Sequence, residues 1–326
     1  MALDLTLGLT LLALLCEAAF GYPRFLFDRI GHPVMWIGWL IHLLDTHLNS
    51  EADAPMERRL DGVATLAVVL AVCIGAGVAL QALALALPAG FVIAALAGST
   101  LLAQRSLYEH VARVADGLEH GLAEGRAAVA HIVGRDPEAL DEAGVARAAI
   151  ESLAENFSDG IVAPALWMAV GGIAGAVAYK GVNTADSMIG HRTRRYAEFG
   201  WASARFDDLL NLPAARLAGV LVGIGAVFVP GASPLRAWRA MWRDAGEHRS
   251  PNAGWPEAAF AGALGLALAG PRQYGGQMSD DGIMGAGGRR ECTAQDIRRA
   301  LRLYRAADAA TIALAAIGWL AAVLAM

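Results

Sequence analysis

Long apolar runs alternate with polar segments along the 326 residues of the chain. Each run is long enough, or nearly so, to cross the roughly 30 Å hydrocarbon core of a bilayer as a helix. The runs cover residues 2–20, 63–87, 89–103, 161–179, 217–229 and 306–326. This pattern predicts an all-α, polytopic integral membrane protein that forms one membrane domain over residues 1–326, with about five to seven crossings.

The composition supports a membrane protein, because 56% of the residues are hydrophobic and only 17% are charged. The net charge of −5 argues against a nucleic-acid partner, which would need a basic face. No Lys or Arg precedes the first apolar run, so we interpret it as a retained helix and not as a cleaved signal. The three cysteines, Cys16, Cys73 and Cys292, form no disulfide framework and no zinc spacing.

Five polar segments contain the 26 Lys and Arg residues outside the central stretches of the apolar runs. They cover residues 22–62, 104–160, 180–216, 232–256 and 271–305. Simple connections are shorter than this, so we expect the chemistry to lie in these segments. The positive-inside tendency would place all five in the cytoplasm, but a single crossing at 161–179 would separate the second from the third. Gly171, Gly172 and Gly175 interrupt that run, which allows a re-entrant or paired half-helix arrangement.

Residues 105–160 have the pattern of amphipathic helices that lie on or beside the membrane surface. Apolar residues repeat there at three- and four-residue steps: Leu107, Val111, Val114, Leu118 and Leu122. Gly134 ends the repeat, and Asp136, Pro137 and Glu138 predict the start of a new helix.

The first candidate site is an acidic stripe formed by Glu151, Glu155 and Asp159, which are spaced four residues apart. In a helix such like charges repel unless a cation lies between them, and Mg²⁺ shared with phosphate oxygens is one such cation. The alternative is that Arg147 neutralises Glu151 and that Asp159 caps the next helix. These residues alone leave both interpretations open.

A second group of polar side chains follows the fourth apolar run directly. Asn183, Asp186 and Ser187 share a helical face, and Arg192 lies just beyond them, so they could hold a metal, a ribose or a phosphate. The alternative is a helix cap followed by a solvated charge run.

A third group, Asp207, Asp208 and Asn211, lies within one helical turn between Arg205 and Arg216. Adjacent aspartates at a membrane boundary are costly to bury without a cation, so ligand binding is favoured over snorkelling to the interface.

Three weaker signals are His32 before Pro33, Glu257 near a predicted helix start with Asn252 and Trp255, and Tyr274 before a Gly pair. Caps and turns explain each of them without a ligand. The chain has no P-loop motif and only one lysine, Lys180, so any phosphate must be held by arginines, backbone amides or a metal.

Taken in order, these segments resemble the cobalamin-biosynthesis membrane family of adenosylcobinamide-phosphate synthases (cobinamide synthases). The resemblance runs from residue 32 to about residue 276 and continues weakly through the last helix. The residues that carry it are His32, Pro33, Val34, Ile37, Gly38, Glu151, Ser152, Ala154, Glu155, Asn156, Ser158, Asp159, Gly160, Asn183, Thr184, Asp186, Ser187, Met188, Phe199, Gly200, Trp201, Asp207, Asp208, residues 252–257 and residues 274–276. Trp39, Asp45, Lys180 and His191 depart from the family pattern.

The resemblance implies ATP-dependent amide formation between adenosylcobyric acid and (R)-1-aminopropan-2-ol or its O-phosphate. It also implies a multi-pass protein of the cell (inner) membrane with a cytoplasmic active site, which could contact other cobalamin-assembly enzymes. With residue chemistry, it suggests Glu151, Glu155, Asp159, Asp186 and His32 as catalytic groups. The suggested metal ligands are Glu151, Glu155, Asp159, Asp186, Asp207 and Asp208, for Mg²⁺. The suggested nucleotide- and substrate-binding residues are Asn156, Asn183, Ser187, Arg192, Arg205, Asn211, Arg216, Asn252, Trp255, Glu257 and Tyr274.

A general base for the amine could be His32 or a spare carboxylate. Two alternatives come from other classes of protein. A transporter or a corrinoid-binding membrane protein without ligase activity could line a pathway with the same residues. A phosphatidyl-alcohol phosphotransferase would need a start motif that Asp116 and Gly117 do not continue.

Overall fold

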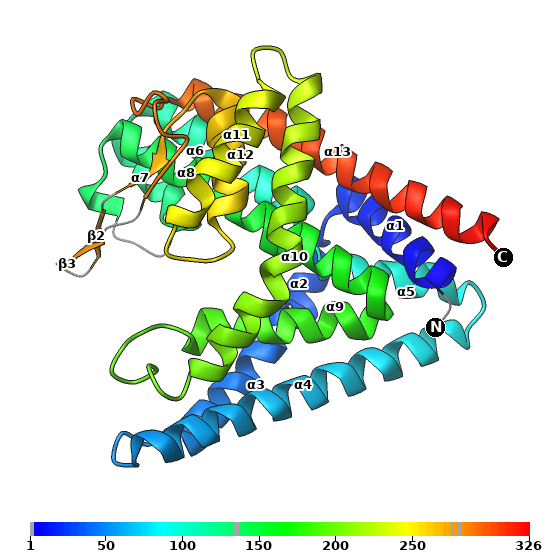
Figure 1. Cartoon of the computed structure of the whole chain (residues 1–326). Helices are drawn as coiled ribbons and strands as arrows, with labels where there is room; N and C mark the ends of the chain where they lie inside the picture. Colours follow the sequence, from blue (N-terminus) through cyan, green and yellow to red (C-terminus); the bar gives the residue numbers. More distant parts are fainter. Residues whose placement is uncertain (1–2, 134–136, 271, 275–276, 280–281) are drawn as a thin grey trace. The chain divides into compact units, whose positions relative to one another are not determined.

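The computed structural model describes residues 3–133, 137–270, 272–274, 277–279 and 282–326, and helices dominate it (Figure 1). The chain divides into two compact units. Unit 1 consists of residues 1–103, 163–211 and 315–326, and unit 2 of residues 104–162 and 212–314. The prediction of an all-α chain is confirmed, with only four strands of two or three residues in the described part.

Unit 1 is built from long helices. Its elements are α1 (Leu3–Phe20), α2 (Arg24–Ile30), α3 (Pro33–Leu48), α4 (Pro55–Leu85), α5 (Gly90–Ser99), α9 (Ala163–Ile189), the first part of α10 (Trp201–Gly225) and the end of α13 (Ala294–Leu324). Proline begins two of these helices. His32 caps α3 by accepting a hydrogen bond from the Val34 amide, and prolines occupy the first positions of α3 and α4.

The core of unit 1 lies between α3, α4 and α9, where an apolar cluster is almost fully buried: Ile37, Ile41, Val69, Cys73, Ala185, Ile189 and Phe199. Small residues allow the close approach. A Cβ on Gly77 of α4 would lie 2.6 Å from the Ala174 Cα, so α4 and α9 pack at backbone distance only because residue 77 is glycine.

The α9 helix is broken at Gly172, where φ is +64° and ψ is −151°. A Cβ on Gly175 would come within 2.1 Å of the Trp167 carbonyl oxygen. In a straight helix eight residues span about 12 Å, so the two halves of α9 must fold back on each other (Figure 1). The Gln81 Oε1 atom of α4 accepts a hydrogen bond of 2.9 Å from the Ile173 amide and so satisfies the broken backbone. This geometry favours the re-entrant, paired half-helix arrangement over a single crossing at 161–179.

Unit 2 contains shorter helices and the strands. Its helices are α6 (Gln104–His120), α7 (Leu122–Val129), η1 (Pro137–Ala139), α8 (Glu142–Phe157), the π-helical η2 (Ser158–Val162), the rest of α10, η3 (Ala226–Phe228), α11 (Pro234–Asp244), η4 (Ala245–Glu247), α12 (Gly254–Leu264) and most of α13. The strands β1 (Leu268–Ala269) and β4 (Ile283–Met284) pair antiparallel, as do β2 (Arg272–Tyr274) and β3 (Gln277–Ser279).

The amphipathic segment of unit 2 differs from its prediction in two places. The repeat that begins at Leu107 breaks at Gly121, whose φ of +155° separates α6 from α7. The expected helix start at Pro137 and Glu138 is only the short η1 turn. The helix α8 begins at Glu142, where Asp141 caps it by accepting a hydrogen bond of 2.7 Å from the Gly144 amide. Gly134 and Asp136 lie outside the described residues.

Six helical stretches of the described chain are long and apolar enough to cross a membrane, judged by length and composition. They are Leu3–Phe20, Pro55–Leu85, Gly90–His120, Glu142–Ile189, Trp201–Phe228 and Ala294–Leu324. Each contains one of the six predicted apolar runs or most of it, so the prediction of a multi-pass membrane protein is confirmed.

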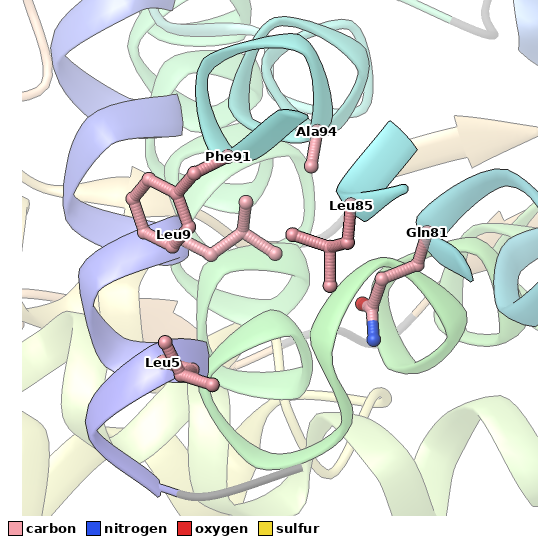
Figure 2. Close-up of a pocket in the computed structure, with 6 residues that line it drawn as sticks. All are labelled: Leu5, Leu9, Gln81, Leu85, Phe91 and Ala94. Carbon is pink, nitrogen blue, oxygen red and sulfur yellow. The ribbon is translucent and has the colours of Figure 1, made fainter. Parts of the chain in front are cut away.

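A small apolar cavity lies between α1, α4 and α5 in unit 1 (Figure 2). Its lining consists of Leu5, Leu9, Gln81, Leu85, Phe91 and Ala94. The cavity encloses about 10 Å³, which is room for about one water molecule and too little for a substrate.

Candidate functional site

Two i,i+4 pairs of polar residues face each other in unit 1, one on α9 and one on α10. The Asn211 amide donates to Asp207 Oδ2 at 2.9 Å on α10. Across the helix interface, the Tyr179 hydroxyl donates to Asn211 Oδ1 at 2.9 Å, and Asn183 Nδ2 lies 3.4 Å from Asp207 Oδ1. Residues four apart share a helix face, so the two pairs close a buried polar cluster of Tyr179, Asn183, Asp207 and Asn211.

This cluster, called the Asp207 cluster below, is unusual for an apolar helix interface. Asp207 is 8% exposed and Asn211 1% exposed. The Asp207 carboxylate receives neutral amide donors, and Asp186 is close enough to act on it electrostatically. A second carboxylate beside a buried one is costly unless a cation or a proton joins them. The donor set of carboxylate and amide oxygens fits a hard cation such as Mg²⁺.

The predicted neighbour Asp186 lies at the end of α9, where its side chain folds over Gly190. A Cβ on Gly190 would lie 2.0 Å from Asp186 Oδ1, so glycine leaves room for this conformation. Ser187 is exposed, and its hydroxyl donates to the Asn183 carbonyl at 2.9 Å, a local bond within α9.

Two arginines surround Asp208 in unit 1. Arg205 Nη1 lies 3.6 Å from Asp208 Oδ2, and Arg192 is close enough to act electrostatically on the same carboxylate. Arg205 and Arg192 are both exposed, so their guanidinium groups can reach an anion in solvent.

His32 contributes to the same unit through its cap on α3. Its Nδ1 accepts a hydrogen bond from the Val34 amide, and the Thr100 backbone provides a second contact. Burial lowers the pKa of His32, and the positive charge of Lys180 lowers it further. The ring is therefore neutral near pH 7, but accepting a proton would cost His32 its helix cap.

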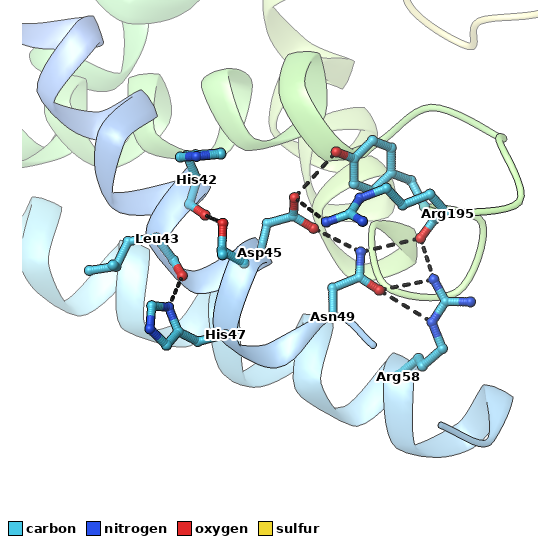
Figure 3. Close-up of polar contacts among 9 residues, drawn as sticks. His42, Leu43, Asp45, His47, Asn49, Arg58 and Arg195 are labelled. Carbon is cyan, nitrogen blue, oxygen red and sulfur yellow. Dashed lines mark hydrogen bonds and ion pairs between the residues drawn. The ribbon is translucent and has the colours of Figure 1, made fainter. Parts of the chain in front are cut away.

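A network of hydrogen bonds holds the loop between α9 and α10 against α3 and α4 (Figure 3). Asp45 accepts hydrogen bonds from Arg195 Nη2 at 2.9 Å, from Asn49 at 2.8 Å and from the Tyr196 hydroxyl at 3.3 Å. Arg58 donates to Asn49 Oδ1 at 2.9 Å and also to the Arg195 carbonyl. The loop also carries His191 and Arg192, so the network holds the backbone from which Arg192 projects.

In unit 2, the predicted acidic stripe has three different environments. Glu151 is 6% exposed, and its Oε1 accepts a hydrogen bond of 2.7 Å from the Ala269 amide of β1. Glu155 is exposed on the last turn of α8, and Asp159 is half-buried in the π-helical η2 segment. Arg147 donates to the Arg290 carbonyl. Single π-turns within α-helices are frequent at functional sites.

Asn156 is exposed beside Glu155, and its amide donates to the Ser152 carbonyl at 2.9 Å. The Ser152 hydroxyl in turn donates to the Ile132 carbonyl at 2.8 Å. The first bond holds Asn156 next to the exposed Glu155, and the second ties the buried Ser152 to the backbone at Ile132.

Arg216, Trp255 and Asn252 lie together in unit 2. The Arg216 guanidinium lies 4.7 Å from the centroid of the Trp255 ring, and its Nη1 lies 3.3 Å from Asn252 Oδ1. The cation–π contact with Trp255 and hydrogen bonds to Asn252 Oδ1 and the Leu212 carbonyl hold the Arg216 guanidinium in place. Glu257 is 3% exposed in the first turn of α12, where its Oε1 lies 3.6 Å from His248 Nε2.

Tyr274 lies in β2, but its side chain, together with Gly275 and Gly276, is outside the described part of the structure. Within the described ranges, no three His, Cys, Asp or Glu side chains gather closely enough to hold a metal ion by themselves. Each group of acidic residues therefore provides one or two metal ligands, and oxygens of the substrate phosphates would provide the others. That Glu155 and Asp207 share a metal stays a prediction from the sequence.

Several residues of these clusters carried no signal in the sequence. Tyr179 ends an apolar run and was counted with it, although its hydroxyl closes the Asp207 cluster. Asn49 lies one helical turn after Asp45, but Arg195 is 150 residues from Asp45 in the chain, and only the fold brings the two together. The i,i+4 spacing of Tyr179 and Asn183 on a helix ending in polar residues is the one signal that could have identified the first of these.

Comparison with known proteins gives a consistent family. The family model described as CobD/Cbib protein matches residues 10–304. A cobalamin biosynthesis protein CobD of Sinorhizobium fredii is 53% identical over 295 residues, covering 90% of each chain. The proteins of the same name from Rhizobium meliloti and Rhodobacter capsulatus are 50% and 48% identical and cover 91% and 93% of this chain, and 91% and 95% of their own length. No solved structure matches. With a family model that matches most of its length and relatives that share half of its residues, this chain belongs to the CobD/Cbib family.

Proposed function

We propose that this protein acts in cobalamin biosynthesis, where it joins a propionate carboxylate of adenosylcobyric acid to (R)-1-aminopropan-2-ol or its O-phosphate with consumption of ATP. The family membership and the names of the relatives support the pathway. The observation that supports the chemistry best is the Asp207 cluster, where a buried carboxylate lies beside Asp186 with amide partners.

The reaction needs an activated carboxylate, because a carboxylate and an amine do not condense unaided in water. In the proposed route, a carboxylate oxygen of the corrinoid attacks the γ-phosphorus of ATP, which gives an acyl phosphate and ADP. The amine nitrogen then attacks the acyl carbon, the carbon–oxygen bond to phosphate breaks, and the nitrogen loses a proton to a base. When bound, Mg²⁺ would neutralise the phosphate charge.

The chain's own residues have separate tasks in this proposal. Asp186, Asp207 and Asp208 in unit 1, and Glu151, Glu155 and Asp159 in unit 2, are the proposed metal ligands. Arg192 and Arg205 project into solvent beside Asp208 and would hold phosphate oxygens, for which a planar guanidinium offers paired donors.

The base is proposed to be a carboxylate and not His32. The His32 imidazole is neutral, as a base requires, but its Nδ1 already holds the start of α3. An exposed carboxylate that does not hold the metal can take the amine proton, whereas His32 would have to give up its helix cap.

Orientation is part of the proposal. Because α9 turns back at Gly172, both ends of the 161–179 run emerge on the same side, so the polar segments before and after it can both face the cytoplasm. A cysteine in place of Arg194 should react with a membrane-impermeant maleimide only from the cytoplasmic face, as should one in place of Arg126. Labelling of position 194 from outside intact cells would contradict the orientation.

The direct test uses the purified protein in lipid nanodiscs with adenosylcobyric acid, aminopropanol phosphate and Mg-ATP, with mass detection of the amide and measurement of ADP. Asp207→Asn should abolish most of the amide formation, whereas Asp53→Asn, in an exposed loop, should leave it unchanged. Corrinoid binding without ATP turnover in the unaltered protein would support the alternative of a transporter or binding protein, for which the broken α9 helix is a shared feature.

A further inference from the structure

The end of α10 and the start of α11 form a helical hairpin in unit 2, and the part around its turn is uncharged. No charged residue occurs between Arg216 and Arg236. The turn contains η3 and Gly231, whose φ is +80°. Ser233 then begins α11 as its N-cap, and its own amide donates to the Ala263 carbonyl at 2.9 Å, which ties the hairpin to α12.

The second helix of this hairpin, α11, runs back along the first, α10. A Cβ on Gly219 of α10 would lie 2.5 Å from Met241 Sδ of α11, so the middle of α11 packs back along α10. Because α11 carries Arg236, Arg239 and Arg243, this half of α10 cannot cross a bilayer without drawing three guanidinium groups into hydrocarbon. The hairpin must enter and leave on one side.

Its tip exposes large apolar side chains. Phe228 is 73% exposed, Val227 64%, Leu235 57% and Ile224 45%. Contiguous exposed apolar residues of this size mark a surface that contacts a membrane or a protein.

The side chains along α11 change character with distance from the tip. Leu235 is followed by the exposed indoles of Trp238 and Trp242, whose rings are 5.8 Å apart. From Leu235 to Trp242 the helix rises about 10 Å. Ala237, Ala240, Met241 and Asp244 occupy the buried face of α11, whereas Trp238 and Trp242 are exposed. The Trp242 ring also contacts the Trp255 ring edge-on, with 5.2 Å between the centroids.

A stripe of arginines runs beside the tryptophans. Arg236, Arg239 and Arg243 are all exposed and lie next to the tryptophan stripe on the helical wheel. An apolar tip with indoles and guanidinium groups on the helix that follows it has the composition of a segment in one bilayer leaflet, because Trp prefers the interface and a long Arg side chain can extend to the phosphates.

The packing of the hairpin against α13 indicates that the tip contacts lipid. A Cβ on Gly225 would lie 2.7 Å from the Ala307 amide nitrogen, so the end of α10 packs against α13 where the apolar run 306–326 begins. That run is part of a helix that is long and apolar enough to cross a membrane. The bilayer surface that α13 enters is therefore at the level of the hairpin tip.

We propose that the α10–α11 hairpin is a monolayer anchor: Val227, Phe228 and Leu235 insert into the acyl region of the leaflet that α13 enters, and Arg236 and Arg239 bind anionic lipid headgroups. None of these five residues is assigned to the reaction, and the proposal does not depend on the proposed activity. Arg243 pairs with Asp244, so Arg236 and Arg239 are the basic groups that remain beside the apolar tip, and each adds attraction to an anionic leaflet.

The test places a fluorophore at the tip of the full-length protein. Phe228→Cys is labelled with an environment-sensitive dye, in a background where Cys16 is replaced by Ser; Cys73 and Cys292 are buried. The matched control is Gly246→Cys, in an exposed turn beyond the opposite end of α11, where a Cβ meets nothing within 4 Å. The protein is placed in nanodiscs of phosphatidylcholine with or without phosphatidylglycerol, and spin-labelled lipids serve as quenchers.

We expect a blue-shifted emission that spin-labelled lipids quench at position 228 and neither effect at position 246. Arg236→Gln with Arg239→Gln should reduce the quenching at position 228 in phosphatidylglycerol discs and leave it unchanged in pure phosphatidylcholine. A dye at position 228 that behaves as in water in both kinds of disc would overturn the proposal. A blue shift that needs native membranes, or two protein copies per disc, would assign the tip to a protein partner or a second copy and would overturn it equally.

Discussion

Asp45 and Arg195 are 150 residues apart in the chain, and their side chains meet at 2.9 Å between Oδ2 and Nη2. The carboxylate is 7% exposed, whereas the guanidinium is 43% exposed, so the pair lies at the edge of the packed helices α3 and α4. Because Asn49 and Arg58 bind the Arg195 carbonyl as well, the backbone of the α9–α10 loop is held at several points.

We expect Asp45→Asn to loosen this loop and to lower the free energy of unfolding by roughly 1–2 kcal/mol, because a hydrogen bond to a charged group is lost while water screens the half-exposed arginine. Hydrogen exchange of residues 190–200 in nanodiscs measures the loosening directly. Glu109→Gln, which removes the exposed pair of Glu109 with Arg105, is the control and should change stability little. Unchanged exchange in Asp45→Asn would mean that the other contacts hold the loop alone.

The break in α9 makes a sharp prediction for two adjacent glycines. Gly172→Ala should destabilise the protein by about 1–3 kcal/mol, because its backbone conformation belongs to glycine and a Cβ would lie 2.3 Å from Gln81 Oε1. Gly171→Ala should cost less than about 0.5 kcal/mol, since a Cβ there meets nothing within 4 Å. Thermal unfolding in detergent compares the two variants, and equal melting temperatures would exclude the turn at Gly172.

Glu155 tests the acidic stripe because it is exposed, so its replacement should not disturb packing. We expect Glu155→Gln to reduce amide formation by tenfold or more, equivalent to about 1.4 kcal/mol of transition-state free energy, with an unchanged unfolding midpoint. Glu109→Gln, on the exposed face of α6, should keep full activity. Chelation of divalent cations with excess EDTA should stop the reaction of the unaltered protein. Full turnover in the Glu155 variant would show that this side chain takes no part in the reaction.

Asp244 predicts how the stability of unit 2 depends on pH. Although burial opposes ionisation, hydrogen bonds from Arg243 and from the Ala286 and Gly285 amides hold the pKa of Asp244 below its usual value. The carboxylate therefore contributes its full stabilisation above its unfolded pKa of about 3.9 and loses it as pH falls through the lower folded value.

Replacement of Asp244 checks this dependence. Asp244→Asn should lower the free energy of unfolding at pH 7 by roughly 1.5–3 kcal/mol, and the difference from the unaltered protein should shrink below pH 4. Denaturant midpoints between pH 3 and pH 7 measure this trend. A difference that stays constant over the whole range would show that the charge of Asp244 is not what stabilises its contacts.

Local patterns were sufficient to predict most of the helices. The apolar runs predicted the six candidate spans, and His32 before Pro33 predicted the start of α3, because length, composition and capping are properties of neighbouring residues. The expected helix start at Pro137 forms only the short η1 turn, and α8 begins after Asp141, which caps it through the Gly144 amide.

The candidate site was predicted in its parts and not in its connections. The spacing of Asp207 and Asn211 indicated a shared helix face, but their contacts with Tyr179 and Asn183 depend on how α9 packs against α10. The glycines of the fourth run indicated a break, yet the partner of the broken backbone, Gln81, lies 92 residues from Ile173. Contacts over such distances are set by tertiary packing, which no local pattern encodes.

The π-turn at Ser158–Val162 sets the rotation about the helix axis between Glu155 and the apolar start of α9. Such a turn accommodates one residue more than an α-helix does, and each residue of an α-helix rotates the following side chains by about 100°. Deletion of Ser158 would therefore regularise the helix and rotate Asp159 away from its present direction with respect to Glu155. Insertions and deletions at this one position of the chain would change the relative aim of two carboxylates without altering either of them.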